Sequence, residues 1–173
     1  MEDGEVTLIS CTQDLPVPKD VNMIYVQDAR ELDAAMNKYY ESSDVVVMAA
    51  AVSDYRPVNQ ANQKIKKEEN DSLDIKLELN PDILFGLGKK KTHQFLVGFA
   101  AETNDVIKHG LEKVKRKNLD MLVANDVAMP GAGFNVPTNI VSILYKDGTM
   151  KQYPKMTKEA LGKIIIEKIV EKL

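Results

Sequence analysis

Cysteine, glycine and long apolar runs are scarce in this chain of 173 residues, and each scarcity excludes a class of protein. The single cysteine, Cys11, cannot form an internal disulfide, and the two histidines do not combine with it in a zinc-binding spacing. No run approaches the ~20 apolar residues of a membrane span, and the first residues lack the basic start and apolar middle of a signal peptide. We therefore expect a cytoplasmic protein without a membrane partner.

Glycine is absent between Gly4 and Gly86, and the later glycines fit neither G-x-G-x-x-G nor G-x-x-x-x-G-K-[ST]. This excludes a P-loop and a complete dinucleotide fingerprint, and it argues against an NAD(P)-dependent oxidoreductase. A doubly wound sheet usually opens with a strand and a glycine-bearing turn that holds phosphate. We therefore expect this chain to begin at what would be the second strand of such a sheet.

The balance of charges points to one ordinary soluble domain over residues 1–173. Lysine and arginine number 23 against 26 acidic residues, which gives a formal net charge of −3. A protein that binds nucleic acid in general needs a basic excess, so we expect no nucleic-acid partner. Any basic site must therefore be local.

Short apolar runs alternate with helical patterns, which predicts an α/β fold: a Rossmann-like three-layer sandwich with a mostly parallel sheet. The uncharged run Val45–Ala51 is too apolar for an edge and is predicted to be a central strand. The other predicted strands are Val6–Ser10, Asn22–Val26, Phe95–Ala100, Met121–Asn125 and a hairpin of Val141–Tyr145 with Thr149–Tyr153. Helices are predicted from Asp28 to Glu41, from Asn80 onward, from Asp105 to Lys117 and from Thr157 to Leu173.

The stretch Leu73–Leu79 alternates strictly between apolar and charged residues, as in a half-exposed strand. Together with Lys64–Lys66 it can form an antiparallel hairpin that stands off the parallel sheet. One apolar face of this hairpin would need a cover, and a second subunit is the obvious candidate. The intervening stretch that begins at Arg56 and ends at Gln63 is predicted to be a mobile loop.

Two clusters lie before and within this predicted hairpin. Ala49–Pro57 places small residues and then Asp54 at the end of the predicted central strand, where open sheets bind ligands; helix packing on alanine with a turn aspartate is the equal alternative. Lys64–Lys67 carries three lysines in four residues. It is either a flap that closes over an anionic substrate or a solvated edge that discourages aggregation.

Two further clusters lie on predicted helices. Asn80–Leu84 is predicted to start a helix, with Asn80 as the cap and Pro81 at the first helical position, and its free amides can hold phosphate or simply be capped. Lys113 and Lys117 fall at the edge of the apolar stripe of their helix, whereas Glu112 and Lys115 are predicted to face solvent. From there the pair can reach toward a ligand, although snorkelling explains Lys113 equally well.

Taken in order, these clusters resemble the phosphopantothenoylcysteine synthetase family, the synthetase half of the bacterial bifunctional coenzyme A biosynthesis flavoprotein. The resemblance covers nearly the whole chain. Its motifs are AAAVSDYRP at 49–57, KIKK at 64–67, LNPDIL at 79–84, VGFAAET at 97–103, KNLDMLVAND at 117–126, GFN at 133–135 and TN at 138–139.

The resemblance implies a ligase that joins 4'-phosphopantothenate to cysteine through an acyl-cytidylate made from CTP. It implies magnesium that accompanies CTP, with Asp54 and Glu102 as candidates to help hold it, and a homodimer. Lys64 corresponds to a flap lysine important for turnover. The implied nucleotide contacts are Met48, Ala49, Ala50, Asp54, Lys64, Pro81, Asp82, Ile83, Leu84, Phe99, Lys113 and Lys117.

The resemblance fails at the front of the chain. Members of the family carry, before the strand corresponding to Val6–Ser10, a strand, a helix and an Asn-x-Ser-Ser-Gly-like stretch that contributes to the phosphate site. The chain is therefore expected to be either a fragment or a native short form that lacks the first strand and helix. The alternative function is a non-catalytic nucleotide-binding or dimerisation module, and no bound FMN is expected because the flavin-binding half is absent.

Overall fold

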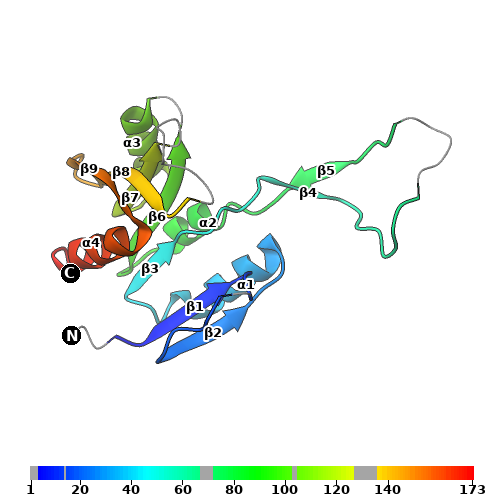
Figure 1. The fold of residues 1–173 in the computed structure, drawn as a ribbon, viewed down its shortest axis with the longest axis horizontal. Coiled ribbons are helices and arrows are strands. Elements are labelled where there is room, and N and C mark those ends of the chain that lie inside the picture. Colours follow the sequence, from blue (N-terminus) through cyan, green and yellow to red (C-terminus); the bar gives the residue numbers. More distant parts are fainter. Residues whose placement is uncertain (1–3, 14, 67–71, 103–104, 127–135) are drawn as a thin grey trace. The chain divides into compact units, whose positions relative to one another are not determined.

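The computed structural model describes residues 4–13, 15–66, 72–102, 105–126 and 136–173 (Figure 1). Its strands are β1 (Val6–Ser10), β2 (Val21–Tyr25), β3 (Val45–Met48), β4 (Tyr55–Pro57), β5 (Leu77–Leu79), β6 (Phe95–Glu102), β7 (Met121–Asp126), β8 (Thr138–Tyr145) and β9 (Met150–Thr157). Its helices are α1 (Ala29–Tyr40), α2 (Ile83–Lys90), α3 (Val106–Arg116) and α4 (Lys158–Val170).

The chain divides into two compact units. Unit 1 contains Met1–Lys38 and Ala51–Asp82, and unit 2 contains Tyr39–Ala50 and Ile83–Leu173. Two strand pairs, β1 with β2 and β4 with β5, belong to unit 1, whereas the five-stranded sheet belongs to unit 2. The predicted α/β class is confirmed.

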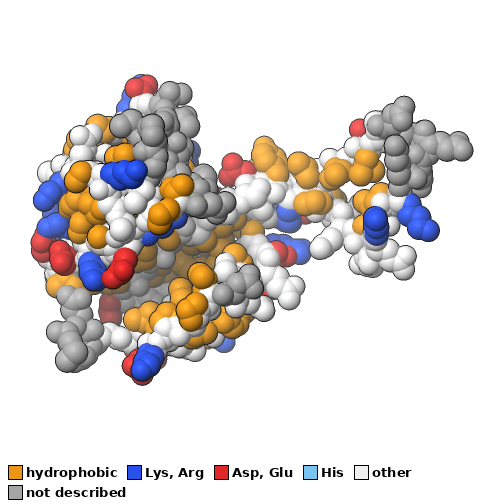
Figure 2. All heavy atoms as spheres, viewed as in Figure 1, with side chains coloured by type: hydrophobic (Ala, Val, Ile, Leu, Met, Phe, Trp, Pro, Cys, Tyr) orange, Lys and Arg blue, Asp and Glu red, His pale blue; other side chains and the backbone are white. Residues whose placement is uncertain are grey.

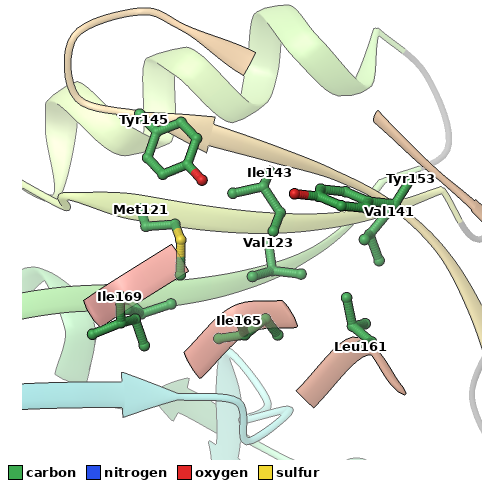
Figure 3. Packing of buried hydrophobic residues seen from close by; sticks show 10 residues of the cluster. Met121, Val123, Val141, Ile143, Tyr145, Tyr153, Leu161, Ile165 and Ile169 are labelled. Atoms are coloured by element: carbon green, nitrogen blue, oxygen red, sulfur yellow. The ribbon is translucent and has the colours of Figure 1, made fainter. Parts of the chain in front are cut away.

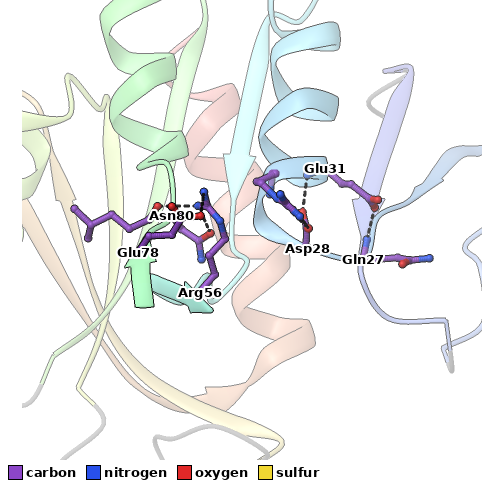
Figure 4. Close-up of polar contacts among 8 residues, drawn as sticks. Gln27, Asp28, Glu31, Arg56, Glu78 and Asn80 are labelled. Atoms are coloured by element: carbon purple, nitrogen blue, oxygen red, sulfur yellow. Dashed lines mark hydrogen bonds and ion pairs between the residues drawn. The ribbon is translucent and has the colours of Figure 1, made fainter. Parts of the chain in front are cut away.

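In unit 1, β1 and β2 pair in parallel, and α1 follows them. The predicted cap of α1 is confirmed, because the Asp28 carboxylate accepts hydrogen bonds from the backbone N–H groups of Arg30 (2.8 Å) and Glu31 (2.9 Å). The Glu31 carboxylate in turn accepts from the Gln27 N–H at 2.7 Å, as Figure 4 shows. The Asp28 carboxylate thus satisfies two N–H groups that a helix start leaves open, and Glu31 ties the residue before the cap to the first turn.

The second strand pair of unit 1, β4 and β5, is antiparallel and short, with Tyr55 opposite Leu79 and Pro57 opposite Leu77. The alternating stretch was therefore predicted in part only, because only its last three residues are strand. The predicted partner was wrong: β5 pairs with β4, while Lys64–Lys66 has no regular structure. Arg56 and Pro57 belong to this strand and not to a loop, because their backbone pairs with β5.

The sheet of unit 2 has the order β3-β6-β7-β8-β9. Its first three strands are parallel, and β8 and β9 add an antiparallel hairpin to the β7 side. Gly148 in the hairpin turn has a φ of 83°, a left-handed conformation that glycine adopts without a Cβ clash. The predicted hairpin and its turn are confirmed.

Helices cover both faces of this sheet. Side chains of β7, β8 and β9 pack with Leu161, Ile165 and Ile169 of α4 in one buried cluster (Figure 3). On the other face, α3 lies so close that a Cβ on Gly110 would meet the Leu144 side chain. Thr157 caps α4 as predicted, since its hydroxyl accepts from the Ala160 N–H at 3.1 Å. Unit 2 is therefore a three-layer sandwich.

The prediction of a central strand at Val45–Ala51 was wrong. The strand is shorter, and among the described strands β3 pairs only with β6, so it forms one edge of the sheet. Val46 and Met48 are buried, whereas Val47 is 41% exposed. An apolar run therefore does not report whether both hydrogen-bonding edges of a strand are occupied, and Val47 shows that it does not require both faces to be covered.

Candidate functional site

The residues that the sequence predicted for a nucleotide site fall in both units. Asp54, Lys64, Pro81 and Asp82 belong to unit 1. The others belong to unit 2: Met48, Ala49, Ala50, Ile83, Leu84, Phe99, Lys113 and Lys117. Each unit therefore carries part of the predicted set.

In unit 1, a polar clasp joins the stretch around Asp54 to the end of β5 (Figure 4). The Asn80 side-chain amide donates to the Ser53 carbonyl at 2.8 Å, and the Asn80 backbone N–H donates to the Asp54 carbonyl at 2.8 Å. The Arg56 guanidinium donates to the Leu79 carbonyl at 2.7 Å and to the Asn80 side-chain oxygen at 3.1 Å. The clasp therefore fixes the backbone on which Asp54 sits.

Arg56 also forms an ion pair with Glu78, with 2.8 Å between its Nη2 and the carboxylate Oε1. Its side chain is 27% exposed and that of Glu78 is 46% exposed, so water screens the pair and its own contribution to stability is small. Arg56 belongs to the motif at 49–57 but was not predicted as a site residue. The signal was available, because a planar guanidinium beside a strand pair can bind several acceptors at once.

The prediction that Asn80 caps a helix was wrong, because its side chain is used by the clasp. Helix α2 begins at Ile83, so Pro81 and Asp82 precede it as exposed residues. An asparagine before Pro-Asp satisfies the local rule for a cap, but here its partners lie 24 and 27 residues away in the chain. Long-range partners of this kind leave no mark in the local sequence.

Asp54 and Lys64 are both exposed. The Asp54 carboxylate has no hydrogen bond or ion pair among the described residues, although its backbone is held by the clasp. Lys67, the last residue of the predicted lysine cluster, lies outside the described residues, as do Thr103 and the GFN motif at 133–135. Both acidic and basic side chains of unit 1 are thus accessible to a ligand.

In unit 2, α2 packs directly on β6. A Cβ on Gly98 would meet the Leu84 side chain at 2.7 Å, so only glycine lets the helix approach this closely. Met48 is opposite Gly98 in the parallel register, which places the end of β3 next to the same position. Phe99 packs with the buried cluster on the α4 side, so its side chain and that of Leu84 lie on opposite faces of β6.

Lys113 and Lys117 are half-buried, while Glu112 and Lys115 are exposed, as the helical pattern predicted. Lys113 lies in α3, and Lys117 is its C-cap, with its N–H donating to the Lys113 carbonyl at 2.9 Å. Gly88 of α2 lies against the Lys117 carbonyl, where a Cβ would overlap the oxygen. The start of α2, the middle of β6 and the end of α3 therefore form one packed group.

A cleft of about 840 Å³ lies in unit 2 between α3 and strands β8 and β9. Its lining includes Val106, Leu111, Ile140 and Ser142, and none of the predicted site residues. Within the described residues no three His, Cys, Asp or Glu side chains are arranged to hold a metal ion. No helix in the described part of the chain is long and apolar enough to cross a membrane.

Some structural residues have shifted pKa values. The Arg30 guanidinium and then the Glu31 N–H lower the pKa of Asp28 to about 2. Burial raises the pKa values of Tyr40 and Tyr145, and the hydrogen bonds from Thr149 lower that of Asp147 in the β8–β9 turn. These shifts belong to a helix cap, to core contacts and to a turn.

Comparisons with known proteins give a consistent picture. Residues 2–173 match the family model described as "DNA/pantothenate metabolism flavoprotein C-terminal domain". The chain is 41% identical over 170 residues to the coenzyme A biosynthesis bifunctional protein CoaBC of Escherichia coli K12, covering 96% of this chain and 42% of that protein. The CoaBC of Bacillus subtilis is 42% identical over 167 residues, covering 96% of this chain and 41% of that protein.

A solved structure, the C-terminal domain of a CoaBC protein, has the same fold. It superposes with a TM-score of 0.78 and 35% identity over 95% of this chain and 72% of that chain. The chain spans less than half the length of the two curated relatives. The resemblance to phosphopantothenoylcysteine synthetases is confirmed at the level of the family.

Proposed function

Because the chain belongs to the family of DNA/pantothenate metabolism flavoprotein C-terminal domains, we propose that it is a phosphopantothenate-cysteine ligase of coenzyme A biosynthesis. Its two units act together as one synthetase domain. The substrates are CTP, 4'-phosphopantothenate and cysteine. The support is the 41% identity to a coenzyme A biosynthesis protein, combined with the accessible charged groups of unit 1.

The reaction has two steps, because a carboxylate is a poor acyl donor. A carboxylate oxygen of 4'-phosphopantothenate attacks the α-phosphorus of CTP, the α–β phosphoanhydride bond breaks, and pyrophosphate leaves with its electron pair. The amine of cysteine then attacks the acyl carbon, the acyl–oxygen bond to CMP breaks, and the amine loses a proton. An amide, CMP and pyrophosphate are the products.

The observation that carries the proposal is the clasp in unit 1. It brings the motif around Asp54 against the LNPDIL motif through four hydrogen bonds that span 23 to 27 residues of sequence. Two stretches that resemble family nucleotide contacts are therefore joined in space by residues of those same stretches. A nucleotide that contacts both stretches requires them to lie together, and the clasp keeps them in that position.

Particular residues take particular roles in this proposal. Lys64, exposed in a stretch without regular structure, closes over the triphosphate and offsets the charge that develops during nucleotidyl transfer. Lys113 and Lys117 contribute further positive charge from the end of α3. The small residues Ala49 and Ala50 leave room for the ribose or base beside Met48.

Magnesium enters with CTP as part of the substrate. Mg²⁺ in nucleotide sites keeps several waters and is held by one or two carboxylates together with the phosphates. The exposed carboxylate of Asp54 suits that role, whereas no cluster of three ligands exists within the described residues. We expect no FMN to bind.

The working form is a homodimer, and the contact is made by the β4–β5 hairpin with the residues just before β5. The exposed fractions of its large apolar side chains lie between 52% and 65%, for Tyr55, Leu73, Ile75, Leu77 and Leu79. Figure 2 shows apolar side chains gathered along this hairpin. An apolar surface of this kind is costly in water and is typical of a protein contact.

Calorimetry with Mg·CTP, followed by an assay of pyrophosphate release with 4'-phosphopantothenate present, tests the ligase. Release that depends on 4'-phosphopantothenate, with formation of the amide after cysteine is added, is the expected result. ATP and NADPH serve as controls for the nucleotide. Binding of CTP without pyrophosphate release contradicts the ligase and supports a non-catalytic nucleotide-binding module.

A further inference from the structure

Asn118 connects the end of α3 to α2. It follows the C-cap Lys117 and has a φ of 51°, a left-handed conformation that asparagine tolerates better than most residues. Its side-chain amide donates to the Gly88 carbonyl of α2 at 3.0 Å. Its own carbonyl accepts from the Lys91 ammonium at 3.1 Å. One residue thus holds both the last turn of α2 and the residue that follows this helix.

A second layer of contacts holds this junction to the sheet. Lys91 forms an ion pair with Asp120, and the two side chains are only 9% and 20% exposed. The Asp120 carboxylate also accepts from the Leu96 N–H of β6 at 2.8 Å. Hydrogen bonds that share partners in a partly buried place support one another, so the junction resists displacement.

The junction leaves no space between α2 and Lys117. Gly88 lies against the Lys117 carbonyl, where any side chain would overlap it, and Leu84 packs against Gly98 one turn earlier on α2. The backbone of Lys117 is therefore fixed relative to Ile83 and Leu84. All three residues are nucleotide contacts in the function proposed above.

We propose that Asn118 is a positioning residue for the nucleotide, acting through Lys117. By fixing the Lys117 backbone to Gly88, it sets where this ammonium meets the phosphates relative to the start of α2. Lysine has a flexible four-carbon stem, whose conformational entropy is lost when the ammonium binds phosphate. A backbone that also moves would add to that loss, so a fixed Lys117 backbone favours binding. The inference rests on the proposed function, in which Lys117 binds the nucleotide.

A double-mutant cycle tests the proposal. Asn118→Gly adopts the left-handed backbone without steric strain and removes the side-chain contacts; glycine also adds backbone freedom to the unfolded chain, which lowers stability equally in both backgrounds. We expect it to raise the Kd for Mg·CTP about fivefold in the native background, and by less than about 1.5-fold in a Lys117→Ala background. The melting temperature of all four proteins is measured alongside. Asn118→Gly should lower it by the same amount in both backgrounds.

Two further variants sharpen the cycle. Asn118→Asp retains the shape of the side chain and its contact with Lys146, but it cannot donate to the Gly88 carbonyl, so it replaces Asn118→Gly if that protein fails to fold. Lys146→Gln alters the exposed contact to the Asn118 side-chain oxygen and leaves Gly88 alone, so Mg·CTP binding should stay unchanged.

Equal losses of affinity in both backgrounds overturn the positioning role and leave a purely structural one. If Lys117→Ala itself leaves Mg·CTP binding unchanged, this inference is overturned together with the place given to Lys117 in the proposed function. If no protein in the series binds Mg·CTP, the proposed function fails first. The failures are therefore distinguishable.

Discussion

Two antiparallel hairpins of this chain use their apolar residues in opposite ways. In the β8–β9 hairpin of unit 2, Ile143 is fully buried and Tyr153 is 9% exposed. In the β4–β5 hairpin of unit 1, Leu77 is 52% and Leu79 is 65% exposed. The first hairpin has strands of eight residues covered by α4, and the second has strands of three residues.

This difference separates residues that stabilise the fold from residues available for contact. Burial of an apolar side chain contributes roughly 1.5–3 kcal/mol, and an exposed one contributes little to the same chain. A hairpin of two short strands is only marginally stable in water. In unit 1 the hydrogen bonds of the clasp around Arg56 and Asn80 supply part of the stabilisation that buried side chains supply in unit 2. The exposed leucines of the β4–β5 hairpin are left available for contact with another surface.

The largest effect comes from cutting the buried hairpin. Ile143→Ala removes a fully buried side chain and should lower the free energy of unfolding by about 2–5 kcal/mol, because it leaves a cavity between sheet and helix. Ile65→Ala, at an isoleucine of unit 1 that is 59% exposed, is the matched control and should change it by less than about 0.5 kcal/mol. Denaturant unfolding followed by circular dichroism measures both, and similar losses would contradict the contrast.

The next effect concerns the rate of the proposed reaction. Lys64→Ala should lower kcat about a hundredfold, or about 2.7 kcal/mol, with the Kd for Mg·CTP changed less than about threefold, because a flap charge acts chiefly as charge develops. Lys76→Ala removes another exposed lysine of unit 1, next to β5, and should leave both constants unchanged. Pyrophosphate release and calorimetry separate the two constants. Equal losses in rate and affinity would refute a flap role for Lys64.

The exposed hairpin should matter for association. Leu77→Glu places a charge on each copy of the proposed contact and should raise the dimer dissociation constant tenfold to a hundredfold, about 1.4–2.7 kcal/mol. Sedimentation equilibrium over a range of protein concentrations measures this. Ile166→Glu, at an apolar residue of α4 that is 46% exposed, controls for the added charge. A monomeric native protein, or a dimer insensitive to Leu77→Glu, would remove the hairpin from the interface.

The sequence was most informative where the structure is local. The caps at Asp28 and Thr157 and the half-buried edge position of Lys113 and Lys117 follow from neighbours within one helical turn, and all are confirmed.

Pairings between distant parts of the chain were the harder part. The strand at Val45 was recognised, but its place at the sheet edge depends on which strands hydrogen-bond, and its own residues do not encode that. Asn80 satisfied the rule for a helix cap, yet its amide binds Ser53 far away in the sequence. Arg56 and Asn118 escaped the prediction for the same reason, since their importance comes from acceptors on other elements.

The clasp itself should give a smaller effect. Asn80→Ala removes the donor to Ser53 and the acceptor for Arg56, and loss of such a half-exposed hydrogen bond costs about 1 kcal/mol. The backbone N–H groups of Val58 and residue 80, which bond to Lys76 and Asp54, should then exchange with solvent about fivefold faster. Asn59→Ala, at an exposed asparagine just after β4, is the matched control. Unchanged exchange in Asn80→Ala would mean that the strand pair holds without the clasp.

The smallest effect is local to α1 and depends on pH. The side chain of Arg30 and then the N–H of Glu31 hold the pKa of Asp28 at about 2, below its ordinary value of 3.8. Because the pKa is depressed in the folded state, the cap stabilises α1 fully above about pH 4 and is lost as the pH falls toward about 2. A carboxyl titration by NMR should show this low value, and Arg30→Gln should raise it, because the largest cause is removed. If Arg30→Gln leaves the pKa of Asp28 unchanged, the backbone N–H groups alone lower that pKa. The stability that this cap gives α1 in acid then comes from the helix start and not from the Arg30 side chain.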